Sequence, residues 1–376
     1  MTMMRKTYKF RLYPSKRQTE ALTGQLAEAC RLYNAALQER RDAWRINHTS
    51  LDYYSQAAQL KEIRAAGDLG ITSYSAAQDV LRRVQRTFEA FFARVRRGAR
   101  PGFPRFKSAA RFDSLTFPEY GKKGCKLLES GKLRVQGVGE IKVKLHRELE
   151  GKIKTATLKR EAGRWFVCFM VECEEKPLPP CPAAVGVDVG LSAFATLSDG
   201  MEINNPCYFR QAQAALRRAQ RKVSRRKRGG NRRRKAVAAL QRMHAHIRNQ
   251  RADFHHKAAR TLVNGYGLIA VEDLNVKGLA SGMLAKPVND AGWSLFISKL
   301  TYKAVEAGRV LVKVDPRGTS QRCVCGADVP KTLKQRRHQC GACGLSVGRD
   351  HASALEILAR GLRVQAVTCA AAQSVA

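Results

Sequence analysis

The sequence predicts a chain of mixed class: a small antiparallel β-sheet or β-barrel that carries a helical insertion, followed by an α/β domain. The hydrophobic period is helical between residues 15 and 97, changes to two between 115 and 175, and then alternates between short apolar strands and long helices. A Pro-rich linker, EEKPLPPCP at 174–182, separates the two parts. At 376 residues the chain is long enough for two or three domains.

The first part begins with a strand, YKFRLYP, and then becomes helical. Ser15 and Gln18 form a capping-box start for a long helix, and a second long helix ends before GARPGFPRFK, where Gly and Pro break it. The segments KLRV, IKVKL, IKTATL and RWFVCFMVE then alternate as strands do. We therefore expect residues 15–114 to be a helical insertion in a barrel made of 1–14 and 115–178.

The charge of the chain limits its partners. Lys and Arg number 69 against 31 Asp and Glu, which gives a net charge of +38 and a pI near 10.4. Such an excess indicates a polyanion, either nucleic acid or an anionic membrane. No apolar run approaches the roughly 18 residues of a spanning helix, and MTMMRKTYKF lacks the apolar stretch of a secretory signal. We expect a cytoplasmic protein that binds nucleic acid and no membrane.

Nearly half of the excess charge lies in one segment. Between Arg210 and Arg260 there are 18 Lys or Arg and one acid, Asp253. Gly229 and Gly230 interrupt the helical pattern, which predicts two helices in a hairpin. A charge run is often only a solvated face, but a nearly unbalanced run repels itself unless an anion lies beside it. The expected phosphate-binding residues of this hairpin are Arg217, Arg218, Arg221, Lys222, Arg225, Arg226, Lys227, Arg228, Arg232, Arg233, Arg234 and Lys235.

Three acids in the second part are candidate site residues. Asp188 lies within the apolar strand AAVGVDVG, where an uncompensated carboxylate costs several kcal/mol of lost hydration. Glu272 ends the strand pattern GLIAVE, and Asp350 begins a helix. Each acid alone could be a solvent-exposed residue at a strand end or a helix cap. Together they are the set that an α/β domain needs to hold two divalent cations over a scissile phosphate.

Clustered carboxylates raise one another's pKa, so such a cluster stays ionised only with cations bound. Oxygen ligands suit Mg²⁺, with Mn²⁺ as a substitute, rather than zinc. An actin-like or sugar-kinase ATPase also opens with a strand and Asp-x-Gly, which VDVG satisfies. That alternative gives no reason for the basic hairpin or for the cysteine cluster described next, so the pattern favours a two-metal nuclease.

Four of the eleven cysteines are clustered. CVCG contains Cys323 and Cys325, and CGAC contains Cys340 and Cys343. Two pairs of thiolates at the ends of a short loop are typical of a closed, structural zinc site. The first pair is C-x-C rather than C-x-x-C, His338 is a candidate substitute ligand, and free thiols or a redox pair are the alternatives. We expect one structural Zn²⁺.

Residues 5–360 resemble the TnpB (OrfB) proteins of insertion sequences, the compact relatives of type V CRISPR effectors. The resemblance is carried, in the family's order, by YKFRLYPSKRQTEAL, GFPRFK, VGVDVGLSAFATLSDG, GLIAVEDLNVKGL, TSQRCVCG…HQCGACGL and RDHASALEIL. It implies a wedge-type β-barrel with a helical recognition insert. It also implies a RuvC-like nuclease domain of RNase H fold (183–316 and 349–362) with a zinc-ribbon insertion (317–348). The last residues, 363–376, read as a disordered tail.

The resemblance further implies an RNA-guided DNA endonuclease that pairs a guide RNA with double-stranded target DNA and cleaves beside a short motif. The family's catalytic, Mg²⁺-binding acids fall on Asp188, Glu272 and Asp350, and its zinc ligands on the four clustered cysteines. The third motif usually reads Asp-x-Asn-Ala-Ala, whereas Ala352 and Ser353 stand here, which leaves the catalytic rate open. The alternatives are a guided DNA-binding repressor that has lost cleavage and a DNA-strand-transferring transposase of the same fold.

Overall fold

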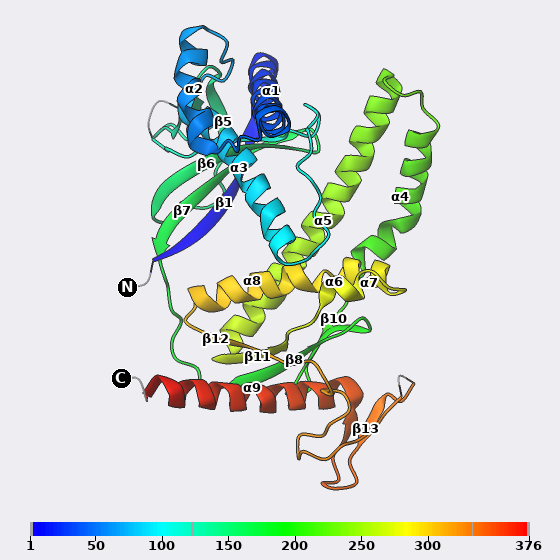
Figure 1. The fold of residues 1–376 in the computed structure, drawn as a ribbon. Coiled ribbons are helices and arrows are strands. Elements are labelled where there is room, and N and C mark those ends of the chain that lie inside the picture. The colour runs from blue at the N-terminus through cyan, green and yellow to red at the C-terminus, as the bar shows by residue number, and fades with distance from the viewer. Residues whose placement is uncertain (1–2, 122–123, 333, 374–376) are drawn as a thin grey trace. The chain divides into compact units, whose positions relative to one another are not determined.

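The computed structural model of the chain describes residues 3–121, 124–332 and 334–373. It divides into two compact units, Met1–Glu174 and Glu175–Ala376, whose elements are drawn in Figure 1. Each unit has its own hydrophobic core. Among the described residues, no helix combines the length and apolarity that crossing a membrane requires.

The first unit is a seven-stranded antiparallel sheet interrupted by helices. The sheet order is β2-β6-β7-β1-β5-β4-β3, so the strand that precedes the helices pairs with strands that follow them. The sheet curls into a nearly closed barrel, because a Cβ atom on Gly124, beside one edge strand, would lie 2.9 Å from the ring of Phe117 on the other. In chain order the elements are β1 (Met3–Tyr13), α1 (Lys16–Asn47), α2 (Tyr53–Ala65), α3 (Tyr74–Arg96), β2 (Ser114–Phe117), β3 (Cys125–Leu127), β4 (Lys132–Val135), β5 (Gly139–Lys144), β6 (Lys152–Glu161) and β7 (Arg164–Glu174).

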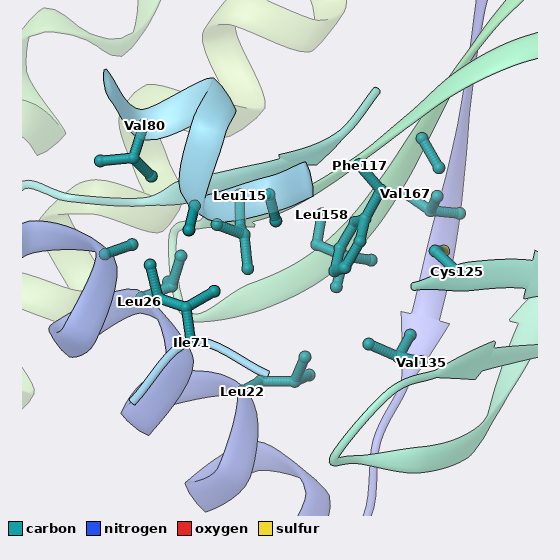
Figure 2. Close-up of a cluster of buried hydrophobic side chains, with 14 of the residues drawn as sticks. Leu22, Leu26, Ile71, Val80, Leu115, Phe117, Cys125, Val135, Leu158 and Val167 are labelled. Carbon is teal, nitrogen blue, oxygen red and sulfur yellow. The ribbon is translucent and has the colours of Figure 1, made fainter. Parts of the chain in front are cut away.

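Local sequence accounts for how this unit is built. The predicted capping box is present: Ser15 Oγ accepts from the Gln18 amide at 3.2 Å, and Gln18 Oε1 accepts from the Ser15 amide at 3.0 Å. Alternate strand residues such as Leu115 face the helices, where they meet Leu26 of α1 and Val80 of α3 in one core (Figure 2). The helical insertion is therefore anchored on the barrel through apolar packing.

The second unit contains a mixed five-stranded sheet of order β10-β9-β8-β11-β12. Strands β8, β11 and β12 are parallel, whereas β9 and β10 pair antiparallel with their neighbours. Helix α9 covers one face, and α5 and α8 pack on the other (Figure 1). The elements are β8 (Ala184–Val189), β9 (Ala193–Leu197), β10 (Glu202–Asn204), α4 (Tyr208–Ser224), α5 (Asn231–Gly265), β11 (Leu268–Glu272), α6 (Val276–Leu279), α7 (Ala285–Ala291), α8 (Trp293–Glu306), β12 (Val310–Val314), β13 (Arg337–Gln339), β14 (Ser346–Gly348) and α9 (Arg349–Gln373).

Helix α9 lies unusually close to the sheet because glycines stand at the contact points. A Cβ atom on Gly186 of β8 would lie 2.0 Å from Ala354 O and 2.6 Å from Leu358 N, both backbone atoms of α9. A Cβ atom on Gly361 of α9 would lie 2.5 Å from Ala270 Cβ on β11. A side chain larger than glycine does not fit at either position, so the two glycines set the distance between α9 and strands β8 and β11.

The prediction of a disordered tail from residue 363 onward is wrong for 363–373, where α9 continues as a helix. After Gly361 the described chain contains neither Gly nor Pro, and its Ala, Leu, Val and Gln residues are compatible with a helix. Residues 374–376 lie outside the described part of the chain.

Candidate nuclease site and metal centres

The structure brings the three predicted acids together on one face of the second unit's sheet. Side chains alternate along a strand, so Asp188 shares the face of Gly186 and Glu272 shares the face of Ala270, which is the face that α9 covers. Strands β8 and β11 are parallel with Val187 opposite Val271, which places the two acids at the same level. Asp350, at the start of α9, is the third member of the group.

Burial and like charges act together on Asp188. Burial raises the pKa of Asp188 to about 8, the neighbouring Glu272 and Asp350 carboxylates contribute to the rise, and Arg349 partly offsets it. Glu272 and Asp350 are therefore both close enough to Asp188 to act on it electrostatically. A site that disfavours its own ionised form in this way gains from a bound cation.

The other two acids each have a positioned polar neighbour. Thr319 Oγ1 donates a hydrogen bond of 2.6 Å to Glu272 Oε1. Burial raises the pKa of Glu272, while the Thr319 hydrogen bond and the charge of Arg360 oppose the rise. Arg349 Nε lies 3.2 Å from Asp350 Oδ1. Thr319 was missed from the sequence because it lies just before the cysteine cluster, with no spacing that relates it to Glu272.

The donor chemistry of this group fits a hard divalent cation, since all three ligands are carboxylate oxygens.

A cavity of about 260 Å³ lies beside Glu272. Its walls include Trp293 and Thr301 of α8 and Lys313 of β12, which pairs with Asp273 at 3.1 Å. The buried Trp293 Nε1 has no hydrogen-bond acceptor among the described residues. Val271 and the α8 residues place this cavity on the side of the sheet opposite α9, so it adjoins Glu272 but contains neither Asp188 nor Asp350. No sequence pattern distinguished Trp293 from a core residue.

The four clustered cysteines form a second candidate metal centre. Their sulfur atoms all lie within 4.8 Å of one another, with Cys323 to Cys343 and Cys325 to Cys340 both at 3.6 Å. Tetrahedral zinc with bonds of about 2.3 Å separates its sulfurs by about 3.8 Å. The backbone N–H groups of Cys343 and Ala342 lower the pKa of Cys340 to about 6, whereas burial raises the pKa of Cys323 to about 12.

His338 is not part of this cluster. It is fully buried, and its Nδ1 contacts the Lys331 side chain. The suggestion that His338 replaces a cysteine ligand therefore finds no support. The cysteine segment leads directly into the acidic site, because β14 runs into α9 and the Arg349 amide donates to Arg336 O at 2.8 Å.

The basic hairpin consists of α4 and α5, joined by a turn over 225–230, as the two glycines predicted. Ten of the twelve expected phosphate-binding residues are exposed, and Arg226 and Arg233 are half-buried. Arg233 Nη1 donates to Val223 O at 2.6 Å, so this residue helps to close the turn. The hairpin's acid, Asp253, pairs with Lys257 at 2.8 Å. The other cations of the hairpin, apart from the half-buried Arg226 and Arg251, are exposed and suit a phosphate backbone.

Models of known protein families match three parts of the chain. Three family models match: HTH_OrfB_IS605, "Helix-turn-helix domain", at residues 1–48; OrfB_IS605, "Probable transposase", at 166–282; and "Cas12f1-like, TNB domain" at 293–357. In this chain residues 1–48 contain strand β1 and the single long helix α1. The last match includes the four cysteines and Asp350.

Two relatives align along almost the whole chain. An RNA-guided DNA endonuclease of Streptomyces pristinaespiralis is 34% identical, with 97% of this chain and 92% of the relative covered. The RNA-guided DNA endonuclease InsQ of Escherichia coli (strain K12) is 29% identical, with 96% and 93% covered. The fold resembles that of Cas12f1 in a cryo-EM structure with sgRNA and target DNA, with a TM-score of 0.61, 14% identity, and 94% of this chain and 98% of that chain covered.

Proposed function

Because the chain belongs to the TnpB (OrfB) family of insertion-sequence RNA-guided DNA endonucleases, we propose that it cleaves double-stranded DNA at sites chosen by a guide RNA and flanked by a short motif. The observation that carries this proposal is the meeting of Asp188, Glu272 and Asp350 on one sheet face. A DNA-binding repressor that does not cleave would have no need of a buried cluster of repelling acids.

The nuclease domain is assigned to the RuvC-like, RNase H type. The mixed five-stranded sheet, with acids on two adjacent parallel strands and a third acid on the covering helix, supports the assignment. The close approach of α9 at Gly186 supports it further, because this contact holds the third acid near the first. The wedge-type barrel corresponds to the seven-stranded sheet, and the recognition insert to α1–α3.

The three acids would hold two Mg²⁺ ions, with Mn²⁺ as a substitute. Bound ions would lower the pKa of the attacking water and stabilise the leaving 3′ oxygen of the scissile phosphodiester. The protein's own residues prepare the site. Thr319 orients the Glu272 carboxylate through its hydrogen bond, and Arg349 moderates the charge at Asp350. The burial of Asp188 excludes water that would otherwise screen the group.

The basic hairpin and the cysteine cluster would have separate roles in this activity. Base pairing with the guide would select the sequence, so the protein needs mainly to hold phosphates. The exposed cations of α4 and α5 suit that role, since phosphate contacts fix position without reading bases. One Zn²⁺ on Cys323, Cys325, Cys340 and Cys343 would be structural, and would stabilise the segment that leads into α9.

Purification with bound nucleic acid tests the guided activity. The protein is expressed together with the insertion-sequence DNA that flanks its gene, and the co-purified RNA is sequenced. The purified protein is then incubated with a plasmid that matches this RNA in the presence of Mg²⁺. We expect a discrete RNA and cutting that stops with EDTA or with a mismatched plasmid. A protein that carries no discrete RNA, and binds nucleic acid regardless of salt, would contradict the proposal.

A further inference from the structure

The helical insertion of the first unit contains a pocket that the proposed nuclease activity does not use. Its volume is about 540 Å³, within the range of ligand-binding pockets. Its walls come from the C-terminal halves of α1 and α3 and from the loops that follow each helix. We call this the aromatic pocket, because its lining includes Trp44, Phe88, Phe91, Phe92 and Phe103.

The rings of the aromatic pocket are exposed yet ordered against one another. Trp44 is 59% exposed, Phe92 53% and Phe103 49%. The ring centroids of Phe91 and Phe92 lie 5.2 Å apart and those of Phe91 and Phe103 5.4 Å apart, both edge-on. A cluster of large exposed rings is costly to hydrate, and such patches mark binding surfaces.

A buried arginine lies in the wall of the same pocket. Arg40 is 7% exposed, and its guanidinium is held by two neutral amides. Its Nε donates to Gln56 Oε1 and its Nη1 to Gln85 Oε1, both at 2.8 Å. Its Nη2 is buried without an acceptor among the described residues. A buried donor left unpaired is destabilising, so binding would be favoured if a ligand oxygen displaced the side chains that cover Arg40 Nη2 and accepted from it.

The charges of the lining indicate which ligand fits. Arg41 and Arg45 line the pocket together with Asp52 and Glu89. The two acids would repel an isolated phosphate, and a purely apolar ligand would leave the Arg40 donor unpaired. A nucleobase has a stacking face, carbonyl oxygens that accept from an arginine, and amino groups that donate to carboxylates. Its phosphates would meet the exposed arginines, in a chain whose net charge is +38.

We propose that the aromatic pocket binds an unpaired nucleobase of a single-stranded RNA or DNA segment, by stacking on its rings and by a hydrogen bond from Arg40. The site is additional to guide–target pairing, in which bases are already paired, and to the basic hairpin, which meets phosphates. Trp44 and Phe92 would supply stacking surface, and Arg40 would be the polar contact.

Tryptophan fluorescence provides a direct test with the full chain. Of the three tryptophans, Trp44 is 59% exposed, whereas Trp165 is 4% and Trp293 5% exposed. The protein, freed of nucleic acid, is titrated at high salt, which weakens phosphate contacts elsewhere. The ligands are oligothymidylate, oligouridylate and an abasic oligonucleotide of equal length. We expect saturable quenching by a base-bearing strand and about tenfold weaker binding of the abasic strand. Comparing the affinities for oligothymidylate and oligouridylate shows whether the pocket prefers DNA or RNA.

Matched variants of α3 separate stacking from general folding. Phe92→Leu keeps an apolar side chain but removes the ring, so the affinity should fall about fivefold or more, and Phe92→Tyr should restore it. Val95→Ala, at an exposed position on the same helix and outside the pocket lining, should leave the affinity unchanged. Equal binding of the abasic strand, or unchanged affinity in Phe92→Leu, would overturn the proposal.

Two further outcomes are decisive. If Trp44 becomes shielded as protein concentration rises without oligonucleotide, a second copy of the chain fills the pocket and the proposal is wrong. The Asp188→Ala variant should keep the quenching, because it changes the other unit. Quenching with no DNA cutting by the wild type would therefore count against the nuclease alone.

Discussion

Replacing Asp188 by Asn should stabilise the protein when no divalent cation is present. Burial and neighbouring acids raise the pKa of Asp188 to about 8, from an ordinary value of 3.8. The folded state therefore holds a proton that the unfolded state releases, and the stability from this group is lost as the pH rises from about 4 to about 8. At pH 7 the loss amounts to about 4 kcal/mol, at about 1.36 kcal/mol for each pH unit above 3.8.

Asn has the same shape and does not ionise, so the variant avoids this loss. For a unit the size of the second one, about 4 kcal/mol corresponds to a rise in Tm of roughly 10 °C. The assay is thermal unfolding of both proteins in EDTA from pH 5 to pH 8. We expect the Tm difference, variant minus wild type, to grow with pH. Comparing the two proteins cancels every other titrating group.

In saturating Mg²⁺ wild type should have the higher Tm, because a cation that binds the folded state stabilises it. The variant lacks one of the carboxylates that would bind the cation, so it should gain less. Asp253→Asn is the matched control, since Asp253 is exposed on α5 and paired with Lys257. It should show neither effect. A Tm difference between Asp188→Asn and wild type that stays near zero from pH 5 to pH 8 would refute the argument that the acids repel one another in a buried site.

Other predictions concern the parts that support the site. Cys340→Ser should lose about one zinc per chain by metal analysis and reduce cleavage, because structural zinc stabilises the segment that leads into Asp350; zinc-free wild type would contradict this. Gly186→Ala should destabilise the protein by at least about 1–3 kcal/mol and abolish cutting, since its Cβ would lie 2.0 Å from Ala354 O; a normal melting temperature would argue against the close packing of α9. Burial lowers the pKa of His255 to about 4, so its contribution to stability is complete above about pH 6.5 and is lost as the pH falls toward 4. Between pH 7 and pH 5 the free energy of unfolding of wild type, measured by denaturant titration, should therefore fall by about 2 kcal/mol relative to that of His255→Gln. A difference between the two proteins that does not change with pH would refute this reasoning.

Much of this molecule follows from local patterns. The period of two predicted strands of the first unit, and short apolar runs predicted strands of the second. Ser15 and Gln18 predicted the first helix, and Gly229 and Gly230 predicted the hairpin turn. The acids could be related to one another because adjacent parallel strands end at the same edge. Their roles in catalysis stay predictions. The cysteine spacing identified a cluster that the structure places within 4.8 Å.

What could not be predicted depends on contacts between distant segments. Thr319 reaches Glu272 across 47 positions, and Gly186 matters because a helix more than 160 positions later crosses it. The unpaired donor of Arg40 exists because glutamines from two other helices hold the rest of the guanidinium. Such features arise from tertiary packing, which residue types and spacing do not encode.

Cleavage of a guide-matched plasmid by wild type and by Asp188→Ala, both loaded with the same RNA, tests the central claim most directly. The substitution removes one carboxylate and leaves the basic hairpin intact, so target binding should persist. Cutting in Mg²⁺ should fall by several orders of magnitude, and adding Glu272→Ala should lower it little further, because residues that act as one unit are not additive. An Asp188→Ala protein that cuts like wild type would show that this acid is not part of the nuclease site.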